Sequence, residues 1–178
     1  RKHPHKMGEW KMDSKTHVAH MDDGDFFSNE TSVTISAPSV GNAKIEFFSE
    51  DQNLTVLKEN ISFQEGEIVD ATFMSRKALR KFLAEQIEEA KDKGVLFSLH
   101  LKATMMKVSD PIIFGQSVEV FFADVFDKHA DAFEELGVNP DNGLGDVYAR
   151  IQNLQEARRH EIETDIQTCL EAQADLYM

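Results

Sequence analysis

The spacing of apolar residues changes period once along the chain, and that change constrains the fold more than any other feature. Before Ser75, apolar and polar residues alternate in short stretches rich in β-branched side chains, which is typical of half-buried strands. The expected strands are Thr31–Ser36, Ala43–Phe48, Leu54–Phe63 and Glu67–Phe73. Turn residues make their connections short, and short connections favour antiparallel neighbours.

After Ser75 the apolar residues recur at helical spacing. Ser75 is a suitable N-cap, and Gly94 a suitable C-terminal stop, for one helix. The stretch Val95–Ala103 then returns to strand-like alternation. Strand, helix and strand in this order predict a βαβ unit, so Glu67–Phe73 and Val95–Ala103 are expected to be parallel within one sheet.

The last third of the chain is predicted to be helical. Asp110 as N-cap and Pro111 after it open one long amphipathic helix that closes near Gly137, and two further helices are expected at Asp146–Asn153 and Gln155–Gln173. The predicted fold class is therefore α/β in the broad sense of mixed α and β: a mixed, partly antiparallel sheet packed against helices. Residues 1–178 are expected to form a single domain or subdomain.

Charge and composition narrow the choice of partners. A net charge of -13 repels phosphate backbones and anionic lipid surfaces, so neither nucleic acid nor a membrane is expected as a partner. The single cysteine, Cys169, can form no internal disulfide, which suits the cytoplasm. The first ten residues, RKHPHKMGEW, are basic and lack an initiator methionine. They indicate either a processed terminus or a chain cut from a longer protein.

Lys102 is the one residue whose position suggests chemistry. On a strand Val95–Ala103, alternation would place Lys102 on a polar face beside His100 and Thr104, near the end of the strand where ligands commonly bind in parallel sheets. A fixed lysine can attract carboxylates and transfer protons. Position alone favours the alternative, a lysine that protects a sheet edge from aggregation. Lys107 is interpreted as a solvent-facing charge.

Other clusters carry weaker signals. Two histidines and three aspartates lie within nine residues: His17, His20, Asp22, Asp23 and Asp25. They lack a recognised ligand spacing and are interpreted as incidental, with two of the three acids serving as turn residues around Gly24. The acidic stretches Glu85–Glu89 and Glu161–Asp165 are interpreted as solvated helix faces. No glycine-rich phosphate loop or nucleophile elbow is present.

Several motifs nevertheless resemble one family throughout the chain. HVAHMDDGDFF, MSRKALRKF, NGLGDVYARI and above all HLKATMMKVSDPI are similar to the monomeric type of NADP-dependent isocitrate dehydrogenase. Members are several times longer than this chain, with a small domain from both ends of the polypeptide and a large domain from its middle. The chain resembles the first half of that large domain, which implies truncation and an isocitrate and isopropylmalate dehydrogenase-like fold.

The resemblance also implies a reaction and a residue. Members oxidise isocitrate with NADP⁺ and release carbon dioxide with the help of Mg²⁺ or Mn²⁺, in the tricarboxylic acid cycle and the glyoxylate bypass. Their catalytic lysine falls on Lys102. Their catalytic tyrosine, metal-binding aspartates and most NADP contacts lie beyond Met178, and other substrate contacts precede Arg1. No metal or cofactor ligand is therefore assigned in this chain, and Tyr148 and Asp110 receive no such role.

Two functions remain open at this point. The chain is either part of an NADP-dependent isocitrate dehydrogenase, inactive by itself and contributing the catalytic lysine, or a stand-alone, non-catalytic binding or assembly module derived from that fold. In the first case the full-length protein is expected to be monomeric. The truncated chain would then expose apolar surface that drives self-association.

Overall fold

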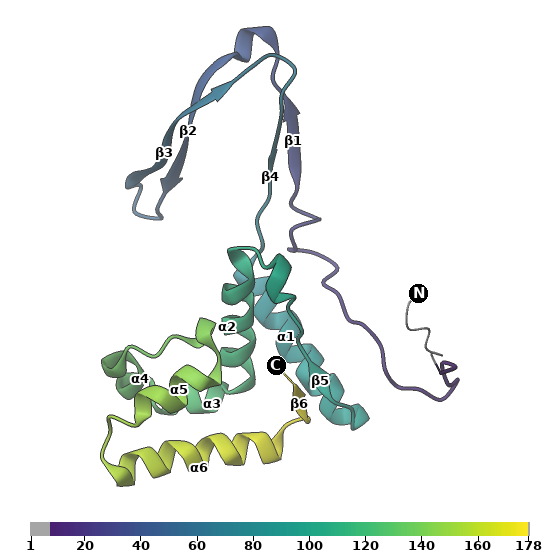
Figure 1. Cartoon of the computed structure of the whole chain (residues 1–178), viewed down its shortest axis with the longest axis vertical. Coiled ribbons are helices and arrows are strands. Elements are labelled where there is room, and N and C mark those ends of the chain that lie inside the picture. The colour runs from purple at the N-terminus through teal and green to yellow at the C-terminus, as the bar shows by residue number, and fades with distance from the viewer. Residues whose placement is uncertain (1–7, 178) are drawn as a thin grey trace, which may run out of the picture. The chain divides into compact units, whose positions relative to one another are not determined.

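The structure is a computed structural model that describes residues 8–177; most of the basic N-terminal stretch, residues 1–7, lies outside the described residues. The chain falls into two compact units. The β unit is Asp22–Ser75, and the helical unit comprises Arg76–Met178 and the residues before Asp22 (Figure 1). Among the residues described, no helix combines the length and the apolar content that crossing a membrane requires.

The β unit contains two antiparallel strand pairs. β1 (Thr31–Thr34) pairs with β4 (Ile68–Ala71), and β2 (Gly41–Phe48) pairs with β3 (Leu54–Phe63). The short 3-10 helix η1 (Ala37–Ser39) links β1 to β2. All four strands expected before Ser75 are therefore present. The antiparallel pairing predicted for strands joined by short connections is confirmed for β2 and β3, whereas β1 pairs with β4 and not with β2.

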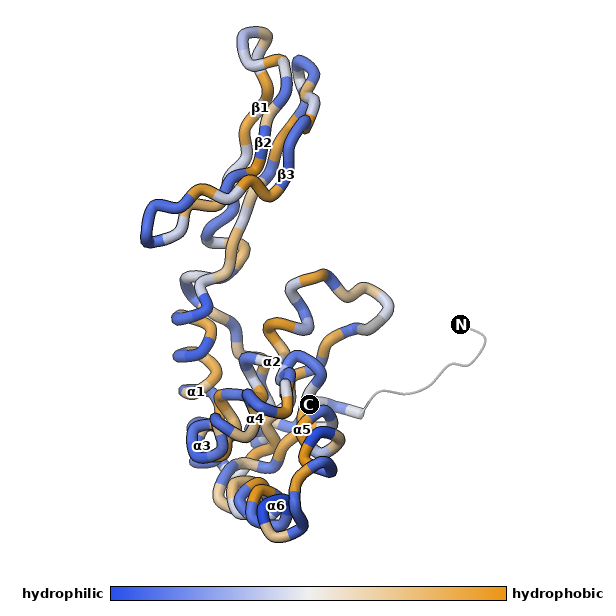
Figure 2. Tube along the Cα trace, turned by 90° about the vertical axis from the view of Figure 1, so that its left-hand side faces the viewer, coloured by the Kyte–Doolittle hydropathy of each residue, from blue (hydrophilic) through white to orange (hydrophobic). Residues whose placement is uncertain are grey.

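The β2–β3 hairpin exposes apolar side chains on both of its faces. Phe48 lies opposite Leu54 and Phe47 opposite Thr55, and consecutive residues of a strand point to opposite faces. The large apolar side chains of this hairpin that are at least 40% exposed are Ile45, Phe47, Phe48, Leu54, Val56 and Leu57. Figure 2 shows hydrophobic positions recurring along both strands. A two-stranded ribbon of this kind is marginally stable in water unless another surface covers it.

The helical unit consists of helices joined by short turns and two very short strands. Its helices are α1 (Arg76–Lys93), α2 (Ser109–Phe121), α3 (Ala123–Lys128), α4 (Ala130–Leu136), α5 (Leu144–Ile151) and α6 (Glu156–Ala172). Its other elements are β5 (Phe97–Ser98), β6 (Leu176–Tyr177) and the 3-10 turns η2 (Ala103–Met105) and η3 (Pro140–Asn142). The predicted mixed α and β fold with a helical C-terminal third is confirmed.

One apolar core holds this unit together. Phe121 and Phe122, at the end of α2, pack with residues of α5 and α6 that are no more than 1% exposed. Those residues are Val147, Ile151, Ile162 and Ile166. Burying each large apolar side chain contributes about 1.5–3 kcal/mol, so this cluster is the main source of stability for the unit.

The single long helix expected from Asp110 to Gly137 is wrong. The segment instead forms α2, α3 and α4, with breaks at Phe122 (φ -104°, ψ 31°) and His129 (φ -112°, ψ 19°). Its apolar stripe is broader than the face that one straight helix can bury. The two breaks turn Phe122 and His129 fully into the core. The predicted stop at Gly137, with φ 64°, is confirmed.

The expected βαβ unit is also wrong. β4 pairs with β1, not with the strand after α1, and that strand is only the two residues of β5. β5 pairs in parallel with β6, Phe97 opposite Leu176. A strand persists only where a neighbour pairs its backbone groups, and β6 supplies that neighbour for two residues. Within the described residues, the strand pairing of this segment covers Phe97 and Ser98.

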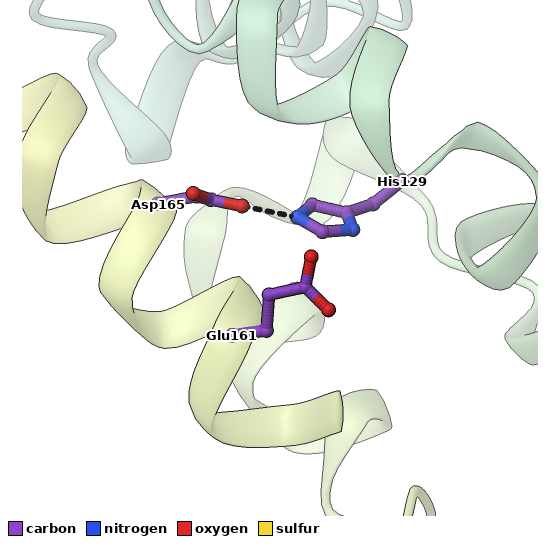
Figure 3. Close-up of side chains that lie close together, drawn as sticks. All are labelled: His129, Glu161 and Asp165. Carbon is purple, nitrogen blue, oxygen red and sulfur yellow. Dashed lines mark hydrogen bonds and ion pairs between the residues drawn. The ribbon is translucent and has the colours of Figure 1, made fainter. Parts of the chain in front are cut away.

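A network of charged groups joins the α3–α4 junction to α6 (Figure 3). The fully buried His129 donates from Nε2 to Oδ2 of Asp165 at 2.6 Å. Lys128 donates to the same oxygen at 2.7 Å, and its Nζ lies 3.3 Å from Oε1 of Glu161. The hydrogen bond from Lys128, followed by that from His129, lowers the pKa of Asp165 below its usual 3.8.

A close helix contact depends on Gly115. A Cβ added to this residue of α2 would lie 2.9 Å from the backbone N of Asp141 in η3 and 3.0 Å from its Cα. Backbone atoms at such distances must move, because side chains cannot relieve the clash. Gly145 in α5 is the natural comparison, since an added Cβ there meets no atom within 4 Å.

We expect Gly115→Ala to lower the free energy of unfolding by about 1–3 kcal/mol, because the added methyl group overpacks the α2–η3 contact. Gly145→Ala should be neutral or stabilise by up to about 1 kcal/mol, because alanine favours a helix more than glycine does. Urea unfolding of the purified variants measures both values. Equal effects of the two substitutions would contradict the close approach of α2 and η3.

We expect Asp165→Asn to destabilise the chain by about 1 kcal/mol at pH 7, because it removes the charge that binds both Lys128 and His129 at a site partly screened by solvent. The folded-state pKa of Asp165 is lowered, so its contribution is present above about pH 4 and is lost as the pH falls through that lower value. The stability gap between the two proteins should therefore close below pH 4. Urea titrations from pH 7 to pH 3 measure the gap, and a constant gap would rule out this role.

Candidate functional site

Lys102 lies between β5 and α2, directly before the turn η2. Its backbone is extended (φ -85°, ψ 102°), and its carbonyl oxygen accepts a hydrogen bond from the Met105 N–H at 3.0 Å. Its side chain is exposed. Within residues 8–177 it makes no hydrogen bond or ion pair, so its ammonium group is available to a ligand.

The structure corrects the way in which Lys102 was expected to be presented. The alternation of a strand ends at β5, and a 3-10 turn begins at Ala103, so His100, Lys102 and Thr104 do not form one strand face. The last residue of β5, Ser98, lies opposite Tyr177 of β6. Lys102 is therefore presented by a turn.

A cavity of about 400 Å³ lies beside the Lys102 turn. The residues that flank η2 contribute His100 and Met106, α2 contributes Phe114, and η3 contributes Asp141 and Asn142. The other lining residues are Leu99, Leu101, Pro111 and Tyr177. Mostly apolar walls with a few polar groups are typical of a ligand site. Lys102 itself does not line this cavity, but the residue before it, Leu101, does.

The N-terminal cluster of histidines and aspartates forms no site. Nε2 of His17 lies 3.9 Å from Glu89, whereas Asp23 and Asp25 accept hydrogen bonds from the backbone of Gly24 and Ser28. These short-range bonds confirm that the two aspartates act as turn residues. Over residues 8–177, the one group with a geometry suited to a metal ion includes none of them.

That group consists of His129, Glu161 and Asp165, which each offer one ligand atom within 4.8 Å of the others (Figure 3). The ammonium group of Lys128 already contacts both carboxylates. These contacts, first the one with Asp165 and then the one with Glu161, raise the pKa of Lys128 above its usual value. A metal ion would have to displace this cation, so the group is best understood as an ion-pair network.

Sequence reasoning missed two features of these regions. Glu161–Asp165 was interpreted as a solvated face, yet Asp165 binds the buried His129; the signal was a histidine within a long apolar stripe. Asp110 was expected to be an N-cap, but α2 begins one residue earlier, at Ser109. The Asp110 carboxylate instead accepts a hydrogen bond from the backbone N–H of Lys107 at 2.7 Å.

Comparison with known proteins identifies the family. A family model described as monomeric isocitrate dehydrogenase matches residues 1–178. The chain is 54% identical over 178 residues to isocitrate dehydrogenase [NADP] of Azotobacter vinelandii. Identity is 50% to isocitrate dehydrogenase [NADP] 2 of Colwellia maris and 47% to the protein of that name from Mycobacterium tuberculosis. The chain spans 24% of the length of each of these relatives.

The family match covers every residue of the chain, including the HLKATMM motif around Lys102. It agrees with the mixed α and β fold described above. This chain therefore belongs to the monomeric isocitrate dehydrogenase family.

Proposed function

We propose that this chain is part of an NADP-dependent isocitrate dehydrogenase that converts isocitrate to 2-oxoglutarate, and that Lys102 is its catalytic lysine. The observation that carries the proposal is the family match over the whole chain, with relatives named as NADP isocitrate dehydrogenases. The exposed ammonium group of Lys102 supports it, because a group held in an internal ion pair could not reach a substrate.

The reaction needs a group that moves protons at the substrate hydroxyl. A hydride leaves C2 of isocitrate for NADP⁺ while the hydroxyl proton is removed, and the resulting keto acid loses carbon dioxide and takes up one proton. A lysine near the hydroxyl can exchange these protons. Its positive form also attracts the substrate carboxylates. Both roles require a side chain that projects from the protein surface into a site completed by other segments.

The described residues do not provide the other components of such a site. The carboxylate of Asp110 binds the Lys107 backbone, and around Lys102 no group of ligand atoms with metal-binding geometry occurs in residues 8–177. No glycine-rich phosphate loop occurs in the sequence. We therefore assign no Mg²⁺, Mn²⁺ or NADP ligand to this chain. These groups would be held by other parts of a longer polypeptide.

The setting follows from the same proposal. Residues 1–178 would be a single domain or subdomain within the large domain of a longer, monomeric enzyme of the tricarboxylic acid cycle and the glyoxylate bypass. The unpaired Cys169, whose Sγ donates to the carbonyl oxygen of Phe121, supports a cytoplasmic location. Other parts of the enzyme would cover the apolar hairpin. The isolated chain would then be inactive and would self-associate.

We expect Lys102→Met to lower kcat by about 10²–10⁴-fold, the usual contribution of a general acid or base. The test protein is the full-length Azotobacter vinelandii relative in which this chain replaces the matching quarter of the sequence. NADPH formation at 340 nm with isocitrate and Mg²⁺ measures turnover, and the isolated chain serves as an inactive blank.

Lys107→Met is the matched control for this experiment. Lys107 is an exposed lysine of the same segment, and its known hydrogen bond uses the backbone, so the control should retain most of the activity. Near-normal turnover of the Lys102→Met protein would refute the catalytic role. It would favour the alternative of a non-catalytic binding or assembly module.

We expect the isolated chain to self-associate through the β2–β3 hairpin, and Phe48→Ser to weaken that association about tenfold or more, because a large apolar side chain would no longer be buried. Phe48 is 65% exposed. Phe27→Ser is the control, since Phe27 is 86% exposed outside the hairpin. Sedimentation velocity over a concentration series measures both. A monomeric isolated chain, or equal effects of the two substitutions, would contradict the prediction.

A further inference from the structure

The segment that carries Lys102 is fixed at its two ends. At the β5 end, the backbone N–H of Leu99 donates to the carbonyl oxygen of Tyr177 at 3.1 Å. At the α2 end, Lys107 and Asp110 bind each other. Between these ends, in the part of the chain that the structure describes, the backbone bond from Met105 to Lys102 is the internal support. We call the hydrogen bonds at these two ends the anchors of the segment. The direction in which the Lys102 side chain projects therefore depends on both anchors.

The anchor at α2 is a pair of reciprocal hydrogen bonds. The Lys107 N–H donates to Oδ2 of Asp110 at 2.7 Å, and the Asp110 N–H donates to the Lys107 carbonyl oxygen at 3.1 Å. A side chain that reaches back three residues to a free N–H in this way fixes the direction in which the chain enters a helix. Pro111 follows and restricts the backbone further.

The anchor lies close to the proposed catalytic residue along the chain. Met106, which precedes Lys107, is extended (φ -64°, ψ 132°), and η2 connects it to Lys102. Because the Lys102 side chain has no partner of its own in residues 8–177, only the backbone determines where its ammonium group can reach. A small rotation at Lys107 would thus be passed to Lys102 through four residues.

We propose that Asp110 is a positioning residue that holds the Lys102 turn in its working geometry. The inference rests on the proposed function, since it gives Asp110 a role only through Lys102. Displacing a reacting group by about 1 Å can cost about 10²-fold in rate. The contacts of Asp110 on which this role rests are those with the backbone of Lys107. Its contribution is the single acceptor oxygen that it offers to Lys107.

The test uses the same full-length graft as the Lys102 experiment. Asp110→Ala should lower kcat about tenfold or more and leave the KM for NADP⁺ within about twofold, because no NADP ligand is assigned to this segment. Asp110→Asn keeps an oxygen at the same distance along the side chain and should restore most of kcat. Asp110→Glu keeps the charge but displaces the acceptor by one methylene group, so it should be slower than Asp110→Asn.

Asp131→Ala is the matched control. Asp131 is also an acid in the first turn of a helix, α4, but it is exposed and lies outside the Lys102 segment. If Asp131→Ala lowers the melting temperature as much as Asp110→Ala does but leaves kcat unchanged, the loss of kcat in Asp110→Ala is due to positioning and not to a less stable helix. This comparison is informative even where Asp110→Ala folds poorly, because Asp110→Asn and Asp110→Glu test the acceptor position independently.

The outcomes distinguish the two proposals. Unchanged kcat in Asp110→Ala, together with an inactive Lys102→Met protein, would overturn the positioning role and leave the proposed function intact. A rate for Asp110→Glu equal to or above that of Asp110→Asn would also overturn it, because charge would then matter more than geometry. Normal turnover of Lys102→Met would instead refute the proposed function itself.

Discussion

The helical unit depends on the burial of one broad apolar stripe, carried by residues 114–133. Phe121 and Phe122 pack on α5 and α6, and the breaks after α2 and α3 let both sides of the stripe face the same core. That packing places α2 against η3, where Gly115 allows the backbones to approach. The cavity beside Lys102 is lined by α2 and η3, so its shape follows from the same burial.

The sequence predicted local structure well wherever one short segment contains its own signals. The alternation of apolar and polar residues predicted the positions of strands β1, β2, β3 and β4. Glycines at positive φ predicted the end of α1 before Gly94 and the end of α4 before Gly137. The sequence also predicts a role for Lys102 from its place in the chain and in a family motif, and this role stays a prediction; the residue is exposed. These features need no information from distant residues.

Long-range partners were the part that sequence could not predict. The segment Val95–Ala103, expected as one strand, pairs at Phe97 and Ser98 with β6, which lies some 80 residues further along the chain. The helix expected from Asp110 to Gly137 breaks where His129 meets Asp165, an interaction between segments 36 residues apart. Period and capping signals report local preference, and tertiary contacts override it at these points.

The exposed hairpin and the exposed lysine have a common physical explanation. The apolar side chains on the two faces of β2–β3 stabilise the protein only when another surface covers each face. An ammonium group without a partner is stabilised by a bound anion. Relatives about four times as long can supply both. Under the proposed function, other segments of a longer polypeptide complete both surfaces, and the position of the Lys102 ammonium group depends on its own segment of the chain. The Lys107–Asp110 pair is the nearest side-chain contact able to fix that segment.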